Sequence, residues 1–260
     1  MIDILEVTLP ELTGDVTRRA YIYIPEAARC SDQHFPVLYM FDGHNVFFDE
    51  HATYGKSWGM GKYLDENQIP MMVAAVECNS APDYSRLSEY SPYDFSSQQF
   101  GNIKGRGRLT MDWIINSFKP DVDRYYPSLP GREDTFIAGS SMGGLMSLYA
   151  VCCFNSVFSR AAALSPSLGF GANMLEELIL KADIAPDTVI YMDMGETEMN
   201  WPGVADNFRR FCGLLQDRNI LLTSRTVPGG MHCEASWERQ IPFFVPTLLY
   251  RPEDRYGNTL

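Results

Sequence analysis

A serine held between glycines, where a predicted strand meets a predicted helix, constrains this chain more than any other feature. The apolar run at 135–138 leads into the sequence Gly-Ser-Ser-Met-Gly-Gly at 139–144, and a helical pattern follows it. A G-x-S-x-G sequence in that context forms a sharp turn that holds the serine hydroxyl out at the N-terminus of the helix. Ser141 is therefore the candidate nucleophile, whereas Ser140 lacks the two flanking glycines.

Short apolar runs alternate with helical patterns along most of the chain. Runs that are apolar throughout predict strands covered on both faces, and they lie at 36–41, 71–78, 135–138, 161–164 and 189–194. Further strands are predicted at 2–9, 19–24 and 221–227. Helical patterns lie at 109–119 (closed by Pro120), 143–153, 174–181, 204–217 and 235–249. This order predicts an α/β fold with a mainly parallel sheet and helices on both faces. The stretch 79–104 has no clear periodicity and is predicted to be a long loop.

Size, charge and hydropathy narrow the class of protein. A chain of 260 residues with 45% apolar residues suits a single domain over residues 1–260. The formal charge of −12 disfavours binding to nucleic acid, because an acidic surface repels phosphates. No run of about 18 apolar residues predicts a membrane span. The first residues lack the basic and apolar regions of a signal peptide, so a cytoplasmic location is expected.

A nucleophilic serine needs a base, and the chain has four histidines. His34 precedes the predicted strand at 36–41, and His44 and His51 follow it. His232 lies on a glycine-rich loop after the last predicted strand. This late position matches the order serine, acid, histidine that goes with a strand–turn–helix nucleophile. His232 is therefore the candidate base.

The candidate acid follows the predicted strand at 189–194. An acidic third member would orient the imidazole and stabilise its protonated form. Glu198 lies three residues past Gly195, where a long side chain can reach back toward the histidine. Glu196 and Asp193 are the alternatives, and a dyad without an acid also remains open.

Two backbone N–H groups are candidates for an oxyanion hole. One belongs to Met142, the residue after the candidate nucleophile, and the other to the loop that follows the strand at 36–41. That loop reads Phe-Asp-Gly-His-Asn at 41–45, and its glycine permits a close backbone approach. We assign the second donor to the N–H of His44.

Three residues are candidates for contact with a substrate. Trp58 follows the oxyanion loop and is predicted either to form a wall of the pocket or to pack in the core. Arg86 is predicted either to pair with Glu89 or to meet an anionic or polar group of a substrate, and Trp201 could cap the pocket. No metal-ligand spacing and no nucleotide-binding motif appears, so no metal and no cofactor is expected.

The chain resembles the putative-esterase family of α/β hydrolases, which includes esterase D, feruloyl and acetyl-xylan esterases, and enterobactin esterases. The resemblance runs from about Tyr21 to Phe244, and it depends on the strand and loop at 37–45, the turn at 139–145 and Gly195-x-x-Glu198. The siderophore branch is similar locally, in Arg86-x-x-Glu89 with Pro92 and in a histidine with tryptophan five residues on. The chain departs from that branch by one extra residue between Gly-Gly and His232.

The residues and the resemblance together predict an α/β-hydrolase fold and a serine carboxylic-ester hydrolase that works through an acyl-enzyme. The expected partner is a small-molecule ester, and a homo-oligomer is compatible with the sequence. Acyl transfer to an alcohol with the same three residues is the first alternative. A noncatalytic binding protein on the same fold is the second, because fold alone does not determine function.

Overall fold

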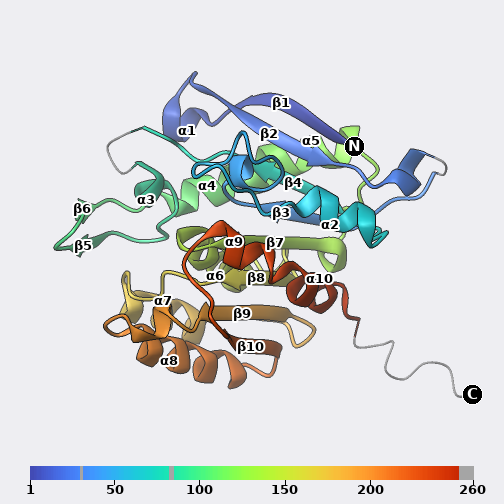
Figure 1. The fold of residues 1–260 in the computed structure, drawn as a ribbon. Helices are drawn as coiled ribbons and strands as arrows, with labels where there is room; N and C mark the ends of the chain where they lie inside the picture. The colour runs from blue at the N-terminus through green and yellow to red at the C-terminus, as the bar shows by residue number, and fades with distance from the viewer. Residues whose placement is uncertain (30–31, 82–84, 252–260) are drawn as a thin grey trace, which may run out of the picture.

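The computed structural model describes residues 1–29, 32–81 and 85–251 (Figure 1). The strands are β1 (Ile2–Thr8), β2 (Thr17–Tyr23), β3 (Val37–Met40), β4 (Met72–Val76), β5 (Phe95–Ser97), β6 (Gly101–Ile103), β7 (Thr135–Ser140), β8 (Arg160–Leu164), β9 (Val189–Gly195) and β10 (Leu221–Val227). The α-helices are α1 (Pro10–Thr13), α2 (Met60–Glu66), α3 (Ser85–Glu89), α4 (Gly107–Trp113), α5 (Lys119–Tyr125), α6 (Met142–Cys153), α7 (Ala172–Lys181), α8 (Val204–Gln216), α9 (Glu234–Glu238) and α10 (Ile241–Leu249).

Eight strands form one sheet in the order β1-β2-β4-β3-β7-β8-β9-β10. The pairs β1–β2 and β2–β4 are antiparallel, and every later pair is parallel. All eight strands were predicted from the sequence, and the mainly parallel sheet is confirmed. Parallel strands end at a common edge, so the turns that follow β3, β7, β8 and β9 come close together there.

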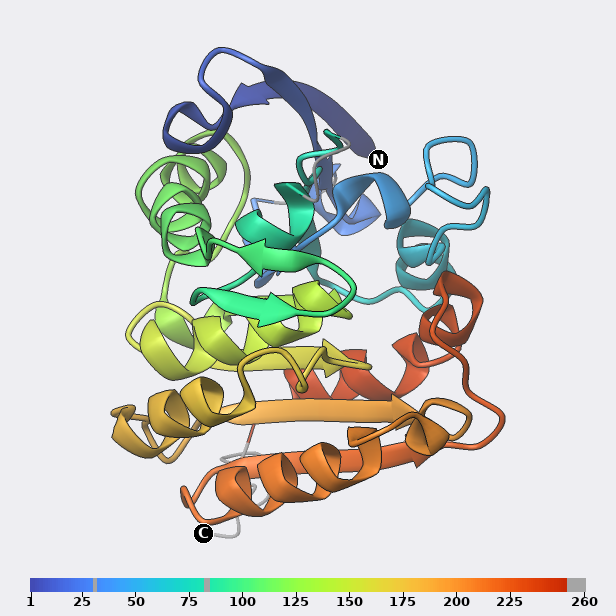
Figure 2. The ribbon, with the colours of Figure 1, turned by 90° about the vertical axis from the view of Figure 1, so that its left-hand side faces the viewer.

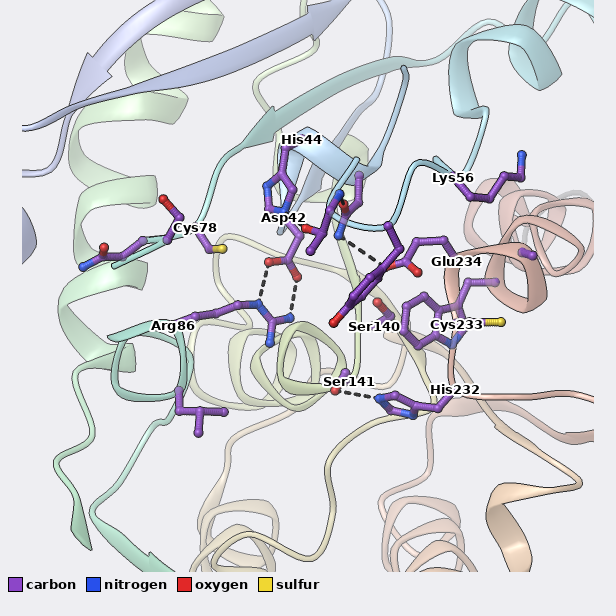
Figure 3. A pocket seen from close by; sticks show the side chains of 18 of the residues that line it. Asp42, His44, Lys56, Cys78, Arg86, Ser140, Ser141, His232, Cys233 and Glu234 are labelled. Atoms are coloured by element: carbon purple, nitrogen blue, oxygen red, sulfur yellow. Dashed lines mark hydrogen bonds and ion pairs between the residues drawn. The ribbon is translucent and has the colours of Figure 1, made fainter. Parts of the chain in front are cut away.

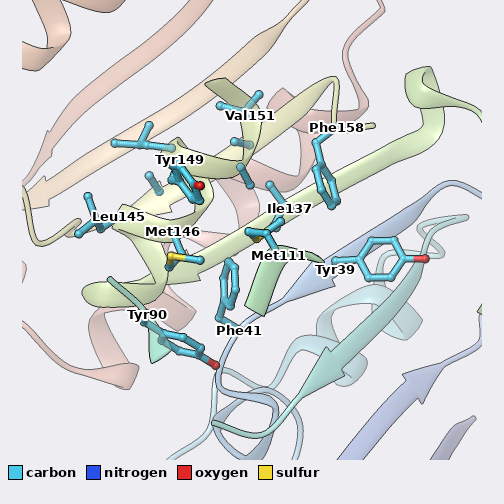
Figure 4. Close-up of a cluster of buried hydrophobic side chains, with 14 of the residues drawn as sticks. Tyr39, Phe41, Tyr90, Met111, Ile137, Leu145, Met146, Tyr149, Val151 and Phe158 are labelled. Carbon is cyan, nitrogen blue, oxygen red and sulfur yellow. The ribbon is translucent and has the colours of Figure 1, made fainter. Parts of the chain in front are cut away.

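Two layers of helices cover the sheet, one on each face (Figure 2). One face packs against α4, α5, α6, α7 and α8 through one large cluster of buried side chains, part of which Figure 4 shows around Ile137 and Phe41. The other face packs against α2, α9 and α10 through a second cluster. Strand residues with both faces covered are mainly apolar, which explains why β3, β4 and the part of β8 after Arg160 have no polar alternation.

The segment after Trp113 differs from the prediction that Pro120 ends a helix. A π-helical turn, Ile114–Phe118, joins α4 to α5, and α5 carries Pro120 in its first turn. Proline lacks an N–H and disrupts the interior of a regular helix, but the first turn tolerates it. The wide π-turn and the restart of the helix at Lys119 therefore let the chain continue to Tyr125.

The stretch predicted as a long loop at 79–104 contains regular structure. It holds α3 and the antiparallel hairpin formed by β5 and β6. The hairpin lies against the turn after β8 through aromatic rings, since the ring of Phe170 is 4.8 Å from that of Phe95 and 6.0 Å from that of Phe100. These elements are too short for a periodic pattern to reveal them, as is α2.

Candidate active site

Ser141 occupies the turn between β7 and α6 with a backbone conformation that side chains rarely adopt. Its φ and ψ angles are 58° and −121°. Gly139 is required by space, since a Cβ on it would lie 2.7 Å from the backbone of Gly143. Residues 139–143 thus form a tight, strained turn that fixes the direction of the Ser141 hydroxyl.

Ser141, His232 and Glu198 form a continuous hydrogen-bonded chain. The Oγ of Ser141 lies 2.9 Å from Nε2 of His232, and Nδ1 of His232 lies 2.6 Å from Oε2 of Glu198. His232 comes from the loop between β10 and α9, and Glu198 from the 3-10 turn Glu198–Asn200 after β9. Three segments far apart in the sequence therefore bring a hydroxyl, an imidazole and a carboxylate into line at one edge of the sheet.

The carboxylate of Glu198 is buried and held from several sides. Its Oε1 accepts hydrogen bonds from the Ser165 hydroxyl at 2.6 Å and from the Gly195 N–H at 3.1 Å. The indole N–H of Trp237 donates to the Ser165 hydroxyl in turn. Glu198 can therefore turn its second oxygen toward His232 without leaving the first unpaired.

The two alternative carboxylates lie elsewhere. Asp193 is buried and accepts hydrogen bonds from the Ser165 N–H at 3.1 Å and the Tyr191 hydroxyl at 2.9 Å. Burial raises the pKa of Asp193 to about 7. Glu196 is exposed and accepts a hydrogen bond from the Gly229 N–H at 2.7 Å. Of the three carboxylates, Glu198 is the one that contacts His232.

The two predicted oxyanion donors both lie in the first turn of a helix. Met142 is the first residue of α6, and His44 is the second residue of the 3-10 turn Gly43–Asn45. Backbone N–H groups there have no partner within their own helix, so they can face a ligand. Gly43 is packed against β4, because a Cβ on it would lie 2.9 Å from the carbonyl carbon of Val76.

A cavity of about 730 Å³ opens beside the Ser141 hydroxyl (Figure 3). Arg86 lines one side of it and Glu234 the other. Trp237 also lines the cavity. Glu234 is buried, and the amide of Asn45 donates a long hydrogen bond of 3.4 Å to it. Burial raises the pKa of Glu234. Charged groups therefore approach the cavity from opposite walls.

Comparison with known proteins decides the family. The model of the family described as putative esterase matches residues 14–247. The chain belongs to the putative esterase family. In the part of this esterase that the structure describes, no helix is long and apolar enough to cross a membrane.

The esterase is similar to proteins from bacteria and fungi. It is 24% identical to the uncharacterised protein YbbA of Bacillus subtilis over 192 residues, which are 70% of this chain and 69% of YbbA. An IroE-like serine hydrolase from Shewanella oneidensis has 20% identity and a TM-score of 0.69, with 91% of this chain and 76% of that chain covered. Siderophore hydrolase EstA from Aspergillus nidulans has 17% identity and a TM-score of 0.71, with 94% of each chain covered. The predicted α/β-hydrolase fold is confirmed.

Trp58 does not lie where a contact with a substrate requires it. The side chain is buried in the second hydrophobic cluster and is absent from the cavity lining. Its ring lies 6.1 Å from that of Trp237 and 6.2 Å from that of Phe244. The prediction that Trp58 contacts the substrate is corrected: it packs in the core behind Trp237, which forms the wall of the cavity.

Arg86 lines the cavity, but it does not pair with Glu89. Its Nε and Nη2 donate to the two carboxylate oxygens of Asp42, each at 2.7 Å (Figure 3). Glu89 instead accepts a hydrogen bond from Arg18 of β2 at 2.6 Å. The two residues of α3 therefore have different ion-pair partners. Among the described residues, Nη1 of Arg86 has no acceptor.

One group of metal-ligating side chains borders the cavity in the described part of the esterase. Asp42, His44 and Cys78 offer one ligand atom each, all within 4.8 Å of one another. Both oxygens of Asp42 already accept hydrogen bonds from Arg86, whose positive charge opposes a cation there. Burial raises the pKa of the Cys78 thiol, which disfavours the thiolate form that a metal needs. We assign no metal to this group.

Sequence reasoning missed Ser165 and Ser167. Both follow β8, within the sequence Ser-Pro-Ser at 165–167. The Ser165 hydroxyl donates to Glu198, and the Ser167 hydroxyl lies 3.3 Å from that of Ser141. The available signal was position: hydroxyl residues directly after a buried strand of a parallel sheet face the edge where the other strands end.

Proposed function

We propose that this esterase is a serine carboxylic-ester hydrolase with Ser141 as nucleophile, His232 as base and Glu198 as the orienting acid. The observation that carries the proposal is the hydrogen-bonded chain from Ser141 Oγ through His232 to Glu198, at 2.9 Å and 2.6 Å. Distances in this range suit proton transfer from the serine hydroxyl to the imidazole. The strained turn at Ser141 and the adjoining cavity supply the direction and the space for a substrate.

The reaction follows from the order of the three side chains. Ser141 Oγ bonds to the ester carbonyl carbon while its proton passes to His232 Nε2. The bond between that carbon and the alcohol oxygen then breaks, and the alcohol leaves with the proton from His232. Water attacks the acyl-enzyme with His232 again as base, which releases the acid and restores Ser141. Glu198 stabilises the protonated imidazole in both halves of the reaction.

The negative oxygen that forms at the carbonyl needs donors that are already in position. The N–H groups of Met142 and His44 are the proposed pair. Met142 begins α6, so the positive end of that helix dipole adds to the attraction. The His44 side chain has a separate contact, since its Nε2 lies 3.0 Å from the Thr53 hydroxyl.

The cavity suggests a substrate that carries a polar or anionic group as well as an apolar one. The Nη1 group of Arg86, which makes no hydrogen bond to Asp42, is suited to an anionic or polar oxygen. Leu87, Phe100 and Trp237 supply apolar surface in the same cavity. The structural neighbour EstA is named a siderophore hydrolase, and we include that class of ester among the substrates to be tested.

A panel of acetyl, butyryl, feruloyl and catecholate-lactone esters tests the proposal on the wild type and on Ser141→Ala. The variant should lose at least about a thousandfold in turnover, as the loss of a nucleophile does, while circular dichroism shows a folded protein. A fluorophosphonate probe should label Ser141 alone. Labelling of Ser140, or full activity in Ser141→Ala, would refute the proposal.

Acyl transfer is separated from hydrolysis by the products. With an added alcohol acceptor, a hydrolase releases mainly the free acid, and an acyltransferase forms mainly the new ester. Both reactions start from the same acyl-enzyme. The products therefore show whether water or the alcohol accepts the acyl group, and the proposed role of Ser141 is the same in either case.

A further inference from the structure

The oxyanion loop begins with a residue in a strained conformation. Asp42 has φ 56° and ψ 50°, the left-handed region, although it carries a side chain and is 5% exposed. Residues without a glycine's freedom persist there when their surroundings fix them. Asp42 directly precedes the 3-10 turn Gly43–Asn45, whose second residue is His44. The backbone of Asp42 therefore sets the direction in which the His44 N–H points.

Two residues from the α3 segment hold Asp42. Arg86 donates to both carboxylate oxygens, each at 2.7 Å, and this bidentate geometry fixes the side chain in one orientation. The hydroxyl of Tyr90, which is fully buried, accepts a hydrogen bond from the Asp42 N–H at 3.1 Å. The guanidinium of Arg86 also lies over the Tyr90 ring, 5.1 Å from its centre. Side chain and backbone of Asp42 are thus held by one short segment.

Strand β4 blocks the loop from the opposite side. Gly43 lies so close to the backbone of Val76 that a single added carbon would come within 2.9 Å of it. Electrostatics agrees with the geometry: although burial raises the pKa of Asp42, the charge and hydrogen bonds of Arg86 outweigh it and keep the pKa below its usual value. The loop is therefore enclosed between β4 and the pair Arg86 and Tyr90.

We propose that Arg86 and Tyr90 are positioning residues that hold Asp42 in its left-handed conformation and so fix the His44 N–H toward the oxyanion. This inference rests on the proposed function, because it assigns a supporting structure to the same oxyanion hole. Donors stabilise a transition state best when they need no reorganisation, so a loosened loop lowers turnover more than it lowers substrate binding.

The test uses Tyr90→Phe and Asp42→Asn. Tyr90→Phe keeps the ring and removes the acceptor for the Asp42 N–H, and Tyr90 does not line the cavity. Asp42→Asn keeps the shape and removes the charge that Arg86 binds. Each should lower kcat about 10- to 100-fold with little change in KM, since a misplacement of about 1 Å costs about a hundredfold.

Glu89→Gln is the matched control. Glu89 lies on the same helix as Arg86, and its buried ion pair is with Arg18 at 2.6 Å rather than with Asp42. This variant should lower the melting temperature as the other two do, but its kcat should stay within about twofold of the wild type. A loss of kcat that merely follows the loss of stability would appear in all three variants.

The affinity for a trifluoromethyl ketone provides a second measurement, which would not change if Tyr90 and Asp42 served stability alone. Ser141 Oγ bonds to the ketone carbon, the proton passes to His232, and the ketone oxygen becomes the oxyanion. Its affinity should fall in Tyr90→Phe and Asp42→Asn by the same factor as kcat, and stay unchanged in Glu89→Gln. If Asp42→Asn does not fold, Tyr90→Phe decides alone.

Two results overturn the inference. One is a wild-type kcat in Tyr90→Phe, and the other is a reduced kcat with unchanged ketone affinity. Fluorophosphonate labelling of wild-type Ser141 reports on the proposed function separately. Labelling at Ser141 together with either result rejects the positioning role and leaves the proposed nucleophile in place.

Discussion

Asp193 and Glu198 are two carboxylates at the end of the same strand, each 1% exposed, and they meet different neighbours. Glu198 contacts the imidazole of His232, whereas the described partners of Asp193 are the neutral donors Ser165 and Tyr191. Ser165 links the two, because its N–H donates to Asp193 and its hydroxyl to Glu198.

The difference shows that burial alone does not decide which carboxylate contacts the imidazole. A buried carboxylate keeps its charge where a cation or several donors favour the ionised form. The pKa of Asp193 is raised to about 7 by burial, although two donors oppose the shift. Asp193 thus has the character of a structural hydrogen-bonding group, and Glu198 has the geometry to stabilise a protonated imidazole. Four substitutions can break or sharpen this contrast.

Glu198→Gln should have the largest effect. The amide keeps the hydrogen-bonding shape but removes the charge that stabilises protonated His232, so kcat should fall by several orders of magnitude, toward the roughly ten-thousandfold loss seen when a triad acid becomes an amide. Steady-state kinetics on the preferred ester measures it. A loss below about tenfold would indicate a dyad of Ser141 and His232.

Asp193→Asn should change stability rather than turnover. The pKa of Asp193 is about 7 in the folded protein, and its ordinary value is 3.8. At a pH between these two values, the folded protein therefore keeps the Asp193 proton, whereas the unfolded chain has lost it. Wild-type stability attributable to this group is therefore complete below about pH 4 and lost as the pH rises through 7. Over this range the wild type should lose up to about 4 kcal/mol relative to the variant.

Urea unfolding at several pH values between 4 and 8 measures this difference. The curve of unfolding free energy against pH should be steeper for the wild type than for Asp193→Asn. Parallel curves would show that Asp193 is ionised in the folded protein, and the contrast with Glu198 would then fail.

Ser165→Ala should have an intermediate effect. It removes the hydroxyl that donates to Glu198 at 2.6 Å but keeps the N–H that donates to Asp193. A hydrogen bond to a charged acceptor contributes about 1.5–3 kcal/mol, so a loss in kcat of about tenfold or more is expected. The double variant with Glu198→Gln should lose little more than Glu198→Gln alone. Additive losses would show that Ser165 acts independently of Glu198.

Glu196→Gln should have the smallest effect. The side chain is exposed and contacts the Gly229 N–H, so activity should stay within about twofold of the wild type. The same assay as for Glu198→Gln measures it. A large loss would transfer the role of the acid to Glu196.

The sequence predicted the features that depend on local pattern. The eight strands of the sheet follow from apolar runs, and the strand–turn–helix context singled out Ser141. The position of Glu198 could be predicted because chain distance past β9 limits how far a side chain reaches back. Contacts across the sequence could not be predicted: Asp42 and Arg86 lie 44 residues apart, and local pattern does not choose between Asp42 and Glu89 as the partner of Arg86.

Trp58 illustrates a second limit. A tryptophan near an oxyanion loop can form a cavity wall or pack in the core. The local direction of the backbone decides between the two, and the sequence pattern does not give that direction. The Trp58 N–H donates to the Asn45 carbonyl at 2.8 Å, and the ring lies 6.1 Å from that of Trp237. Ser165 was missed for a related reason, because its contacts are with Asp193 of β9 and with Glu198 of the turn that follows β9.

The separation of the three residues along the chain also has a consequence during protein synthesis. Ser141 precedes His232 by 91 residues. At a synthesis rate of about 5–20 residues per second, the serine leaves the ribosome's active centre roughly 5–20 s before the histidine is added. Throughout that interval the nascent chain carries the Ser141 hydroxyl without His232, so it cannot become acylated by the proposed route. The order of the residues thus delays reactivity until β10 has been made.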